Sequence, residues 1–139
     1  MRRRSLLTLL AFLSAAPAGA ADQVFDKAIL QGMDKVSGRI IKFEAPVGQS
    51  VRYGTLEIIV RTCRKHPPEE TPEAAAFIDI WEIRTGEPAA SLFRGWMFSS
   101  SPALSALEHP VYDVWVADCA DPLAPPESQP LPPSETRPQ

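Results

Sequence analysis

The sequence predicts a mainly β protein, a small antiparallel sandwich or partly open barrel with one short helix and one disulfide. Apolar residues follow a two-residue period in several runs, which is typical of strands that bury one face. These runs recur at regular spacing between prolines and glycines, and the chain has two cysteines. Six or so short strands with one short helix favour a compact sandwich or barrel.

The first 20 residues predict a signal peptide. Three arginines at residues 2–4 precede an apolar run at residues 6–13, and residues 18–20 are small, as a signal peptidase requires. The apolar run is shorter than the roughly 20 residues that span a bilayer. We therefore expect cleavage after Ala20, a periplasmic mature protein and no transmembrane segment after cleavage. An uncleaved N-terminal anchor is the alternative.

Removal of this leader leaves an acidic chain. The leader holds three arginines and no acid, so 14 basic residues become 11 against 17 acidic ones, a net charge of −6. Such a chain lacks the general electrostatic attraction for phosphate backbones and anionic lipid that basic proteins have. We therefore expect no nucleic-acid partner.

Alternating or β-branched and aromatic runs mark the strands of the folded domain, which we place at residues 21–120. The first two runs flank a stretch with turn chemistry at residues 34–38 and predict an opening hairpin. Gly48 and Gly54 mark further turns or bulges. The expected strands cover residues 28–33, 39–44, 56–60, 75–83, 92–98 and 111–119.

A proline-rich loop at residues 65–72 and one helix complete the domain. Serines at residues 99–101 precede Pro102 and predict a capped helix start. Pro110 prevents continuation beyond His109, so about two turns fit. His109 is expected to close the helix by satisfying its last carbonyls.

Cys63 and Cys119 are expected to pair, because pairing is the default for an even cysteine count in an oxidising compartment. Each follows the apolar part of its strand, so the bridge is expected to join strand ends rather than cross the middle of the core. Residues 121–139 are rich in proline, serine and acid and predict a disordered tail. A ligand for a proline-recognising groove is the alternative interpretation of this tail.

Two constellations resemble chemical sites, and neither is supported. The Cys63-x-x-His66 spacing suits a metal, but only two histidines exist and the cysteine is expected to be oxidised, so we expect no metal and no cofactor. Glu108, His109 and Asp113 with the nearby serines suggest a hydrolase triad. The nucleophile elbow and oxyanion hole that such a triad needs are not visible in the sequence.

Two carboxylates interrupt apolar strands. If Asp79 and Asp113 face inward, each must be paired, and Arg61, Arg84 or Arg94 are the candidate partners. A structural ion pair or an outward-facing position is the favoured interpretation.

The three tryptophans lie on separate expected strands at Trp81, Trp96 and Trp115. Burial in the core is the favoured interpretation for most of them. If exposed, they offer a platform for sugar rings or for a protein partner.

Several segments together cover nearly all of the domain: residues 30–39, 46–48, 53–58, 60–63, 67–70 and 95–116. In these segments the sequence resembles the bacterial family called domain of unknown function 2155, with Met33 and Ser37 as slight departures. The resemblance implies an exported protein with no assigned activity, although some members carry a cellulase-like label. It also implies a gene neighbourhood that includes an accessory subunit of the respiratory NADH–quinone oxidoreductase, and this motivates an accessory or assembly role.

The sequence therefore predicts a periplasmic, non-enzymatic binding or accessory module with a protein partner at the inner membrane or envelope. An envelope polysaccharide hydrolase is the alternative, and an inert structural component of a larger complex is a third interpretation. The oligomeric state stays open. The candidate interaction surface consists of Trp96, Glu108, His109, Tyr112, Asp113 and Trp115.

Overall fold

The computed structural model describes residues 21–105, 107 and 109–122. The predicted leader at residues 1–20 and all but the first two residues of the predicted tail at 121–139 lie outside the described residues. Within the described ranges no helix is both long and apolar enough to cross a membrane.

The described chain is an antiparallel sheet of seven strands, of which the sequence predicts all but the short β3. β1 is central and pairs with β2, β4 and β7, while β4 also pairs with β3 and β5, and β5 pairs with β6. The strands are β1 (Gln23–Asp34), β2 (Arg39–Pro46), β3 (Ser50–Tyr53), β4 (Leu56–Lys65), β5 (Ala74–Glu82), β6 (Ala90–Phe98) and β7 (Tyr112–Pro122).

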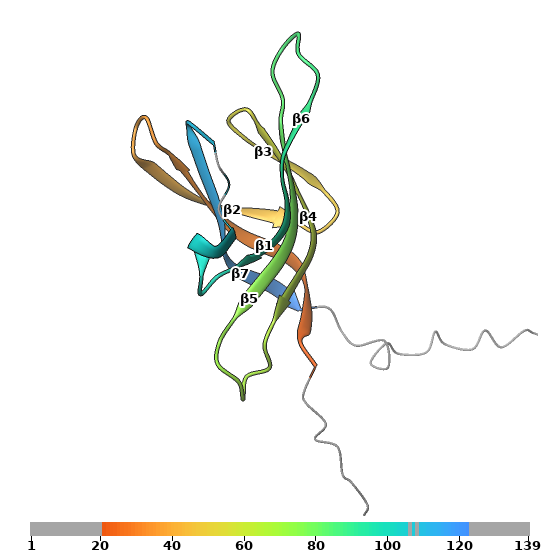
Figure 1. The fold of residues 1–139 in the computed structure, drawn as a ribbon. Coiled ribbons are helices and arrows are strands. Elements are labelled where there is room, and N and C mark those ends of the chain that lie inside the picture. The colour runs from red at the N-terminus through yellow and green to blue at the C-terminus, as the bar shows by residue number, and fades with distance from the viewer. Residues whose placement is uncertain (1–20, 106, 108, 123–139) are drawn as a thin grey trace, which may run out of the picture.

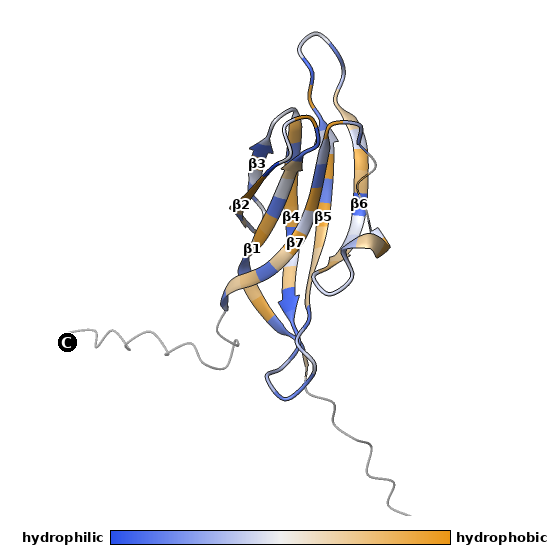
Figure 2. Cartoon of the chain, turned by 90° about the vertical axis from the view of Figure 1, so that its left-hand side faces the viewer, coloured by the Kyte–Doolittle hydropathy of each residue, from blue (hydrophilic) through white to orange (hydrophobic). Residues whose placement is uncertain are grey.

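The sheet folds over on itself at β1, so that it forms two layers (Figures 1 and 2). Along one edge, β1 pairs first with β4 (residues 23–25) and then with β2 (residues 27–34). Along its other edge, β1 pairs with β7. One layer is thus β2-β1-β7 and the other is β3-β4-β5-β6. The sheet remains open between β6 and β7, which agrees with a sandwich or partly open barrel.

The core between the layers is mainly aliphatic. Leu30, Leu56, Ile58, Ile78 and Ile80 are fully buried and come from β1, β4 and β5. The three tryptophans are not among the buried residues, so the prediction of a tryptophan core is wrong. Branched aliphatic side chains on alternate strand positions already fill the narrow space between two sheets.

The predicted disulfide joins β4 to β7 across the start of β1. Cys63 and Cys119 are buried, with their Cα atoms 5.8 Å apart. Cys63 lies opposite Phe25 and Cys119 lies opposite Ala28 in the two ladders of β1. The bridge therefore lies near the ends of both strands, as expected, and fastens the layers where β1 passes between them.

The predicted helix is present only as a 3₁₀ helix of four residues, Pro102–Ser105. Its closing bond runs from Leu104 N–H to the Ser101 carbonyl, three residues back. Of the three serines expected to cap this helix, Ser99 and Ser100 do not, because their hydroxyls donate to the Glu73 carboxylate. Ser101 directly precedes the helix.

The predicted hairpin between β1 and β2 is confirmed. The Asp34 carboxylate accepts hydrogen bonds from the N–H groups of Val36 and Ser37, 2.8 and 3.2 Å away. Gly38 has a φ of 70°, which an L side chain rarely adopts. This turn chemistry fixes the register of the two strands beyond it.

Candidate functional site

A histidine–carboxylate pair lies buried at one end of the sheet. His109 Nε2 lies 2.6 Å from Glu82 Oε2, and both side chains are about one-tenth exposed or less. His109 Nδ1 accepts hydrogen bonds from the N–H groups of Val111 and Tyr112, each 3.0 Å away. Since Nδ1 is an acceptor, the ring proton belongs on Nε2, which donates to Glu82. Both ring nitrogens are thereby engaged.

Glu82 accepts two further hydrogen bonds at its other oxygen. Thr55 Oγ1 donates from 2.5 Å and Arg84 Nε from 3.1 Å. The Thr55 hydroxyl is the largest influence on the carboxyl, and together with His109 and Arg84 it outweighs the opposing effect of burial. These donors lower the pKa of Glu82 from its ordinary value of 4.5 to about 2. The carboxylate is therefore ionised throughout the neutral range.

An aromatic ladder connects this pair to β2 by way of β3. The His109 ring stacks on Tyr112 at 5.3 Å, Tyr112 meets Tyr53 edge-on at 5.4 Å, and Tyr53 stacks on Phe43 at 5.5 Å. The ladder thus runs from the segment before β7, past the end of β3, to β2. Such contacts stabilise the fold beyond the area that they bury.

Two glycines make room for the ladder. A Cβ on Gly54 would lie 2.3 Å from Tyr112 Cζ, and a Cβ on Gly32 would lie 2.7 Å from Tyr53 Cζ. Gly54 also has a φ of 58°. Gly32, Tyr53, Gly54 and Tyr112 belong to three separate segments that carry the family resemblance, and the fold brings them together.

The pair borders an open pocket of about 260 Å³, but its chemistry does not suit hydrolysis. None of the described residues that line the pocket carries a hydroxyl or thiol nucleophile. A glycosidase acid needs a raised pKa, and the pKa of Glu82 is lowered. His109 would lose two backbone hydrogen bonds if it took a proton on Nδ1. Glu82 and His109 thus form a structural latch, which joins the end of β5 to the segment before β7. The residues that line the pocket are Glu82, Arg84, Glu87, Pro88, Ala90, Leu92, His109 and Pro110.

The outer face of the β4-β5-β6 layer holds the second arrangement. Asp79 points outward from the middle of β5 but is only 2% exposed, because two arginines cover it. Arg61 Nε lies 2.7 Å from Asp79 Oδ2, and Arg94 Nε lies 3.5 Å from Oδ1. The predicted ion pair is thus present, with Arg61 and Arg94 as partners, whereas Arg84 pairs with Glu82.

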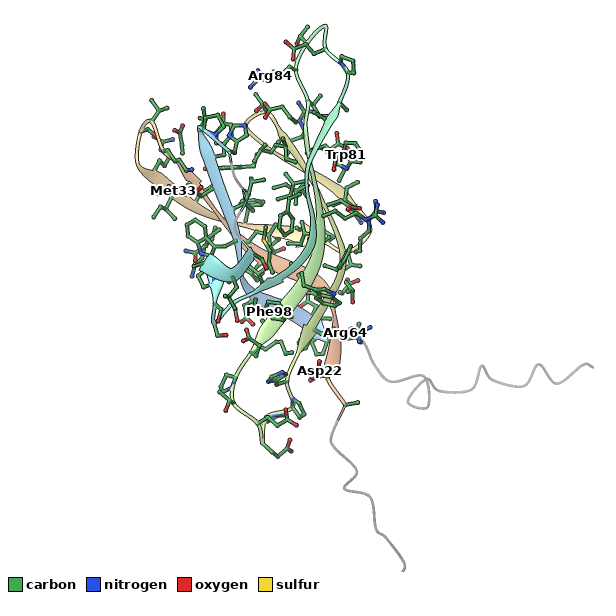
Figure 3. The ribbon with its side chains drawn as sticks, in the orientation of Figure 1. Asp22, Met33, Arg64, Trp81, Arg84 and Phe98 are labelled. Atoms are coloured by element: carbon green, nitrogen blue, oxygen red, sulfur yellow. A yellow bond between two sulfur atoms is a disulfide. The ribbon has the colours of Figure 1, made fainter. Side chains whose placement is uncertain are left out.

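Aromatic side chains continue this face along β6. Trp96 and Phe98 are 38% and 36% exposed, and Trp96 meets Phe77 of β5 edge-on at 5.6 Å. Arg64, Ala75 and Asp22 join Trp96 and Phe98 around a hollow of about 260 Å³. We call this surface the arginine–aromatic face; Trp81 and Arg64 lie on its side of the molecule in Figure 3. Its members are Arg61, Arg64, Phe77, Asp79, Arg94, Trp96 and Phe98.

The structure divides the residues of the sequence-predicted surface between the layers. Trp96 points outward from β6, whereas Trp115 points outward from β7 and donates a hydrogen bond to Gln31 of β1. Asp113 pairs with Lys35 at 2.8 Å. Neighbours in the chain are therefore not neighbours on the surface.

The remaining residues of that surface belong elsewhere. His109 and Tyr112 belong to the latch and the ladder, so the prediction that His109 closes a helix is wrong. Glu108 lies outside the described residues.

Sequence reasoning missed Glu82 as the partner of His109 and Arg64 as a neighbour of Trp96. The Glu82 pairing joins positions 27 residues apart and leaves no local pattern. A pattern was available for the arginine–aromatic face, because Arg94, Trp96 and Phe98 alternate along β6 and must share one side.

Comparisons with known proteins agree with the predicted resemblance. A family model described as an uncharacterized protein conserved in bacteria (DUF2155) matches residues 28–119. An uncharacterized protein of Rickettsia prowazekii (strain Madrid E) is 29% identical over 87 residues, which cover 63% of this chain. The chain spans 56% of the length of that relative. No solved structure matches the chain.

Proposed function

The chain belongs to the DUF2155 family of uncharacterized bacterial proteins, and from this premise we propose that it is a non-enzymatic binding or accessory module of the cell envelope. The observation that carries the proposal is the arginine–aromatic face. The outer face of this layer exposes Trp96 and Phe98 beside three arginines on a chain that is acidic as a whole. The family description states no activity, so the proposal depends on this geometry.

The composition of the face favours a protein partner over a sugar. Tryptophan, phenylalanine and arginine are enriched at the energetically dominant positions of protein interfaces. Arg61 and Arg94 share one carboxylate, Asp79, and Arg64 adds a further positive charge. The face thus carries more positive than negative charge and complements an acidic partner with apolar side chains.

The buried latch supports the non-enzymatic part of the proposal. Glu82 and His109 satisfy each other and their neighbours, which suits a structural role better than proton transfer. The alternative, a polysaccharide hydrolase, needs a carboxyl that is protonated near neutral pH. The lowered pKa of Glu82 disfavours that alternative at this site.

The periplasm is the proposed location. The predicted signal peptide and the buried Cys63–Cys119 bridge both suit an oxidising compartment outside the cytoplasm. N-terminal sequencing of the protein from its native source is expected to begin near Ala21. Free, alkylatable thiols at both cysteines in that material would contradict the proposed location.

The first partner to test is an inner-membrane respiratory complex, which the family's gene neighbourhood suggests. The test is affinity capture from native membranes, with quantitative mass spectrometry of the wild type and of matched variants. We expect Trp96→Ala and Arg94→Ala to reduce capture of an enriched partner at least about tenfold, as central interface residues do. Their matched controls, Trp115→Ala on the other layer and Arg52→Ala on β3, are expected to retain it.

Two outcomes would overturn the proposal. Equal capture by the wild type and by both face variants, with unchanged melting temperatures, would remove the face from binding. Release of reducing sugar from envelope polysaccharide by the wild type, abolished in Glu82→Gln, would instead favour the hydrolase.

A further inference from the structure

The β1–β2 hairpin projects from the body of the fold (Figure 1). It also exposes aliphatic side chains. Val36 at the turn is 82% exposed, and Ile40 and Ile41 of β2 are 53% and 40% exposed. These three are among the most exposed large apolar side chains of the described residues. Scattered single apolar residues on a surface are ordinary, but three within six positions on one projecting turn are not.

The exposure is two-sided. Ile40 and Ile41 are adjacent in a strand, so they point to opposite faces of the ribbon. Residues 39–42 are all exposed, although Ile41 keeps more cover than Ile40, so the body of the protein buries neither face of this end of β2. A flat protein surface would cover only one face of such a ribbon. A fluid apolar medium can surround both.

Two cations accompany the aliphatic side chains. Arg39 and Lys42 are exposed, and neither makes an ion pair within the part of the chain that the structure describes. The carboxylates nearby are already engaged: Asp34 accepts from backbone N–H groups, and Asp113 pairs with Lys35 at 2.8 Å. The tip therefore offers, beside its apolar side chains, two cations that make no ion pair with a described carboxylate.

We propose that this hairpin tip, defined as residues 33–42, inserts into the interfacial layer of a phospholipid bilayer. Val36, Ile40 and Ile41 would enter the acyl boundary, and Arg39 and Lys42 would reach lipid phosphates with their long side chains. The net charge of −6 expected after removal of the predicted leader opposes any general attraction to anionic lipid, so binding depends on insertion of the tip and only modestly on salt.

The insertion is independent of the proposed protein-binding face. In Figure 3, Met33 on the hairpin lies on the side of the molecule opposite Trp81 and Arg64. A hairpin seated in a bilayer would thus leave the arginine–aromatic face free. The two surfaces can be tested separately.

The test is co-sedimentation of the protein, purified from its native compartment, with protein-free vesicles of phosphatidylethanolamine and phosphatidylglycerol. We expect the wild type to bind, and Val36→Asp or Ile40→Asp to weaken binding about tenfold each. That factor corresponds to the free energy gained when one aliphatic side chain leaves water. Arg39→Ala is expected to weaken it about threefold at low salt. Vesicles of phosphatidylcholine alone, in which choline balances the phosphate charge, are expected to retain the aliphatic part of the binding and to lose most of the effect of Arg39.

Leu104→Asp is the matched control, because Leu104 is 79% exposed on the 3₁₀ helix, which contacts β6. It should leave vesicle binding unchanged. Failure of the wild type to sediment with these vesicles would overturn the proposal. So would sedimentation only with native membranes, since the tip would then fit a protein partner. Equal loss in Leu104→Asp and Val36→Asp would also overturn it.

Discussion

The Glu82 latch gives the sharpest stability prediction. Replacing Glu82 with glutamine keeps the size of the side chain but removes the negative charge. The carboxylate accepts hydrogen bonds from Thr55, Arg84 and His109, and a neutral amide accepts them more weakly. We expect the variant to fold but to lose stability at neutral pH. The wild type is expected to lose the same stability when the medium is made acidic.

The magnitude follows from the pKa of Glu82. The Thr55 hydroxyl leads the donors that lower this pKa from 4.5 to about 2. A shift of that size corresponds to about 3 kcal/mol of folding free energy. Because the folded pKa lies below the unfolded one, this contribution is complete above about pH 5. It is lost as the pH falls toward 2.

The assay is urea unfolding followed by tryptophan fluorescence from pH 7 to pH 2.5. The difference in unfolding free energy between the wild type and Glu82→Gln is expected to be about 3 kcal/mol at pH 7 and less than about 1 at pH 2.5. The pKa of Glu73 is also lowered, because hydrogen bonds from Ser100 and Ser99 exceed the opposing effect of burial. Using the difference between the two proteins cancels that contribution.

Glu87→Gln is the matched control, because Glu87 is exposed on the turn after β5. It should change stability by less than about 0.5 kcal/mol at every pH. Parallel stability curves for the wild type and Glu82→Gln across the whole range would refute the latch. A destabilisation of similar size in Glu87→Gln would also refute it.

Three further predictions concern the backbone, the bridge and the ion pairs. Gly54→Ala should lower the unfolding free energy by about 3 kcal/mol, because the new Cβ would meet the Tyr112 ring. Gly86→Ala, which has open space around it, should lower the unfolding free energy by about 1 kcal/mol. Equal urea midpoints for the two variants would contradict this. Reducing Cys63–Cys119 should lower the unfolding free energy by about 4 kcal/mol, and an unchanged midpoint in reductant would count against it. Asp79→Ala should cost about 2 kcal/mol at low salt, and less in 1 M salt where the ion pairs are screened; a cost independent of salt would contradict the role of the arginines.

The strands were predictable because their physics is local. A two-residue apolar period places one face in the core, and it predicts six of the seven strands. The short β3, between the turns at Gly48 and Gly54, was not predicted. The turn at residues 34–38 was predictable for the same reason, since Asp34 bonds its own neighbours and Gly38 takes the left-handed conformation. The disulfide followed from the cysteine count.

The latch and the surfaces were not predictable, because they depend on which segments the topology brings together. His109 pairs with Glu82, 27 residues earlier in the chain, and the Ser99 hydroxyl donates to Glu73 instead of capping a helix. The tryptophans favour the core by residue type, yet β6 is an edge strand whose outer face no described element covers. Trp96 therefore remains exposed. Trp96 and Trp115 lie on the consecutive strands β6 and β7, but these strands belong to different layers, so the two side chains lie on different surfaces.

The central claim is that the arginine–aromatic face holds a protein partner. Its most direct test is a photocrosslinking amino acid at position 96 in living cells, compared with the same amino acid at Glu44, which is exposed on β2 of the other layer. The account predicts one discrete crosslinked partner from position 96, suppressed by Arg94→Ala, and none from position 44. Crosslinks from position 44 alone, or the same adducts from both positions, would contradict it.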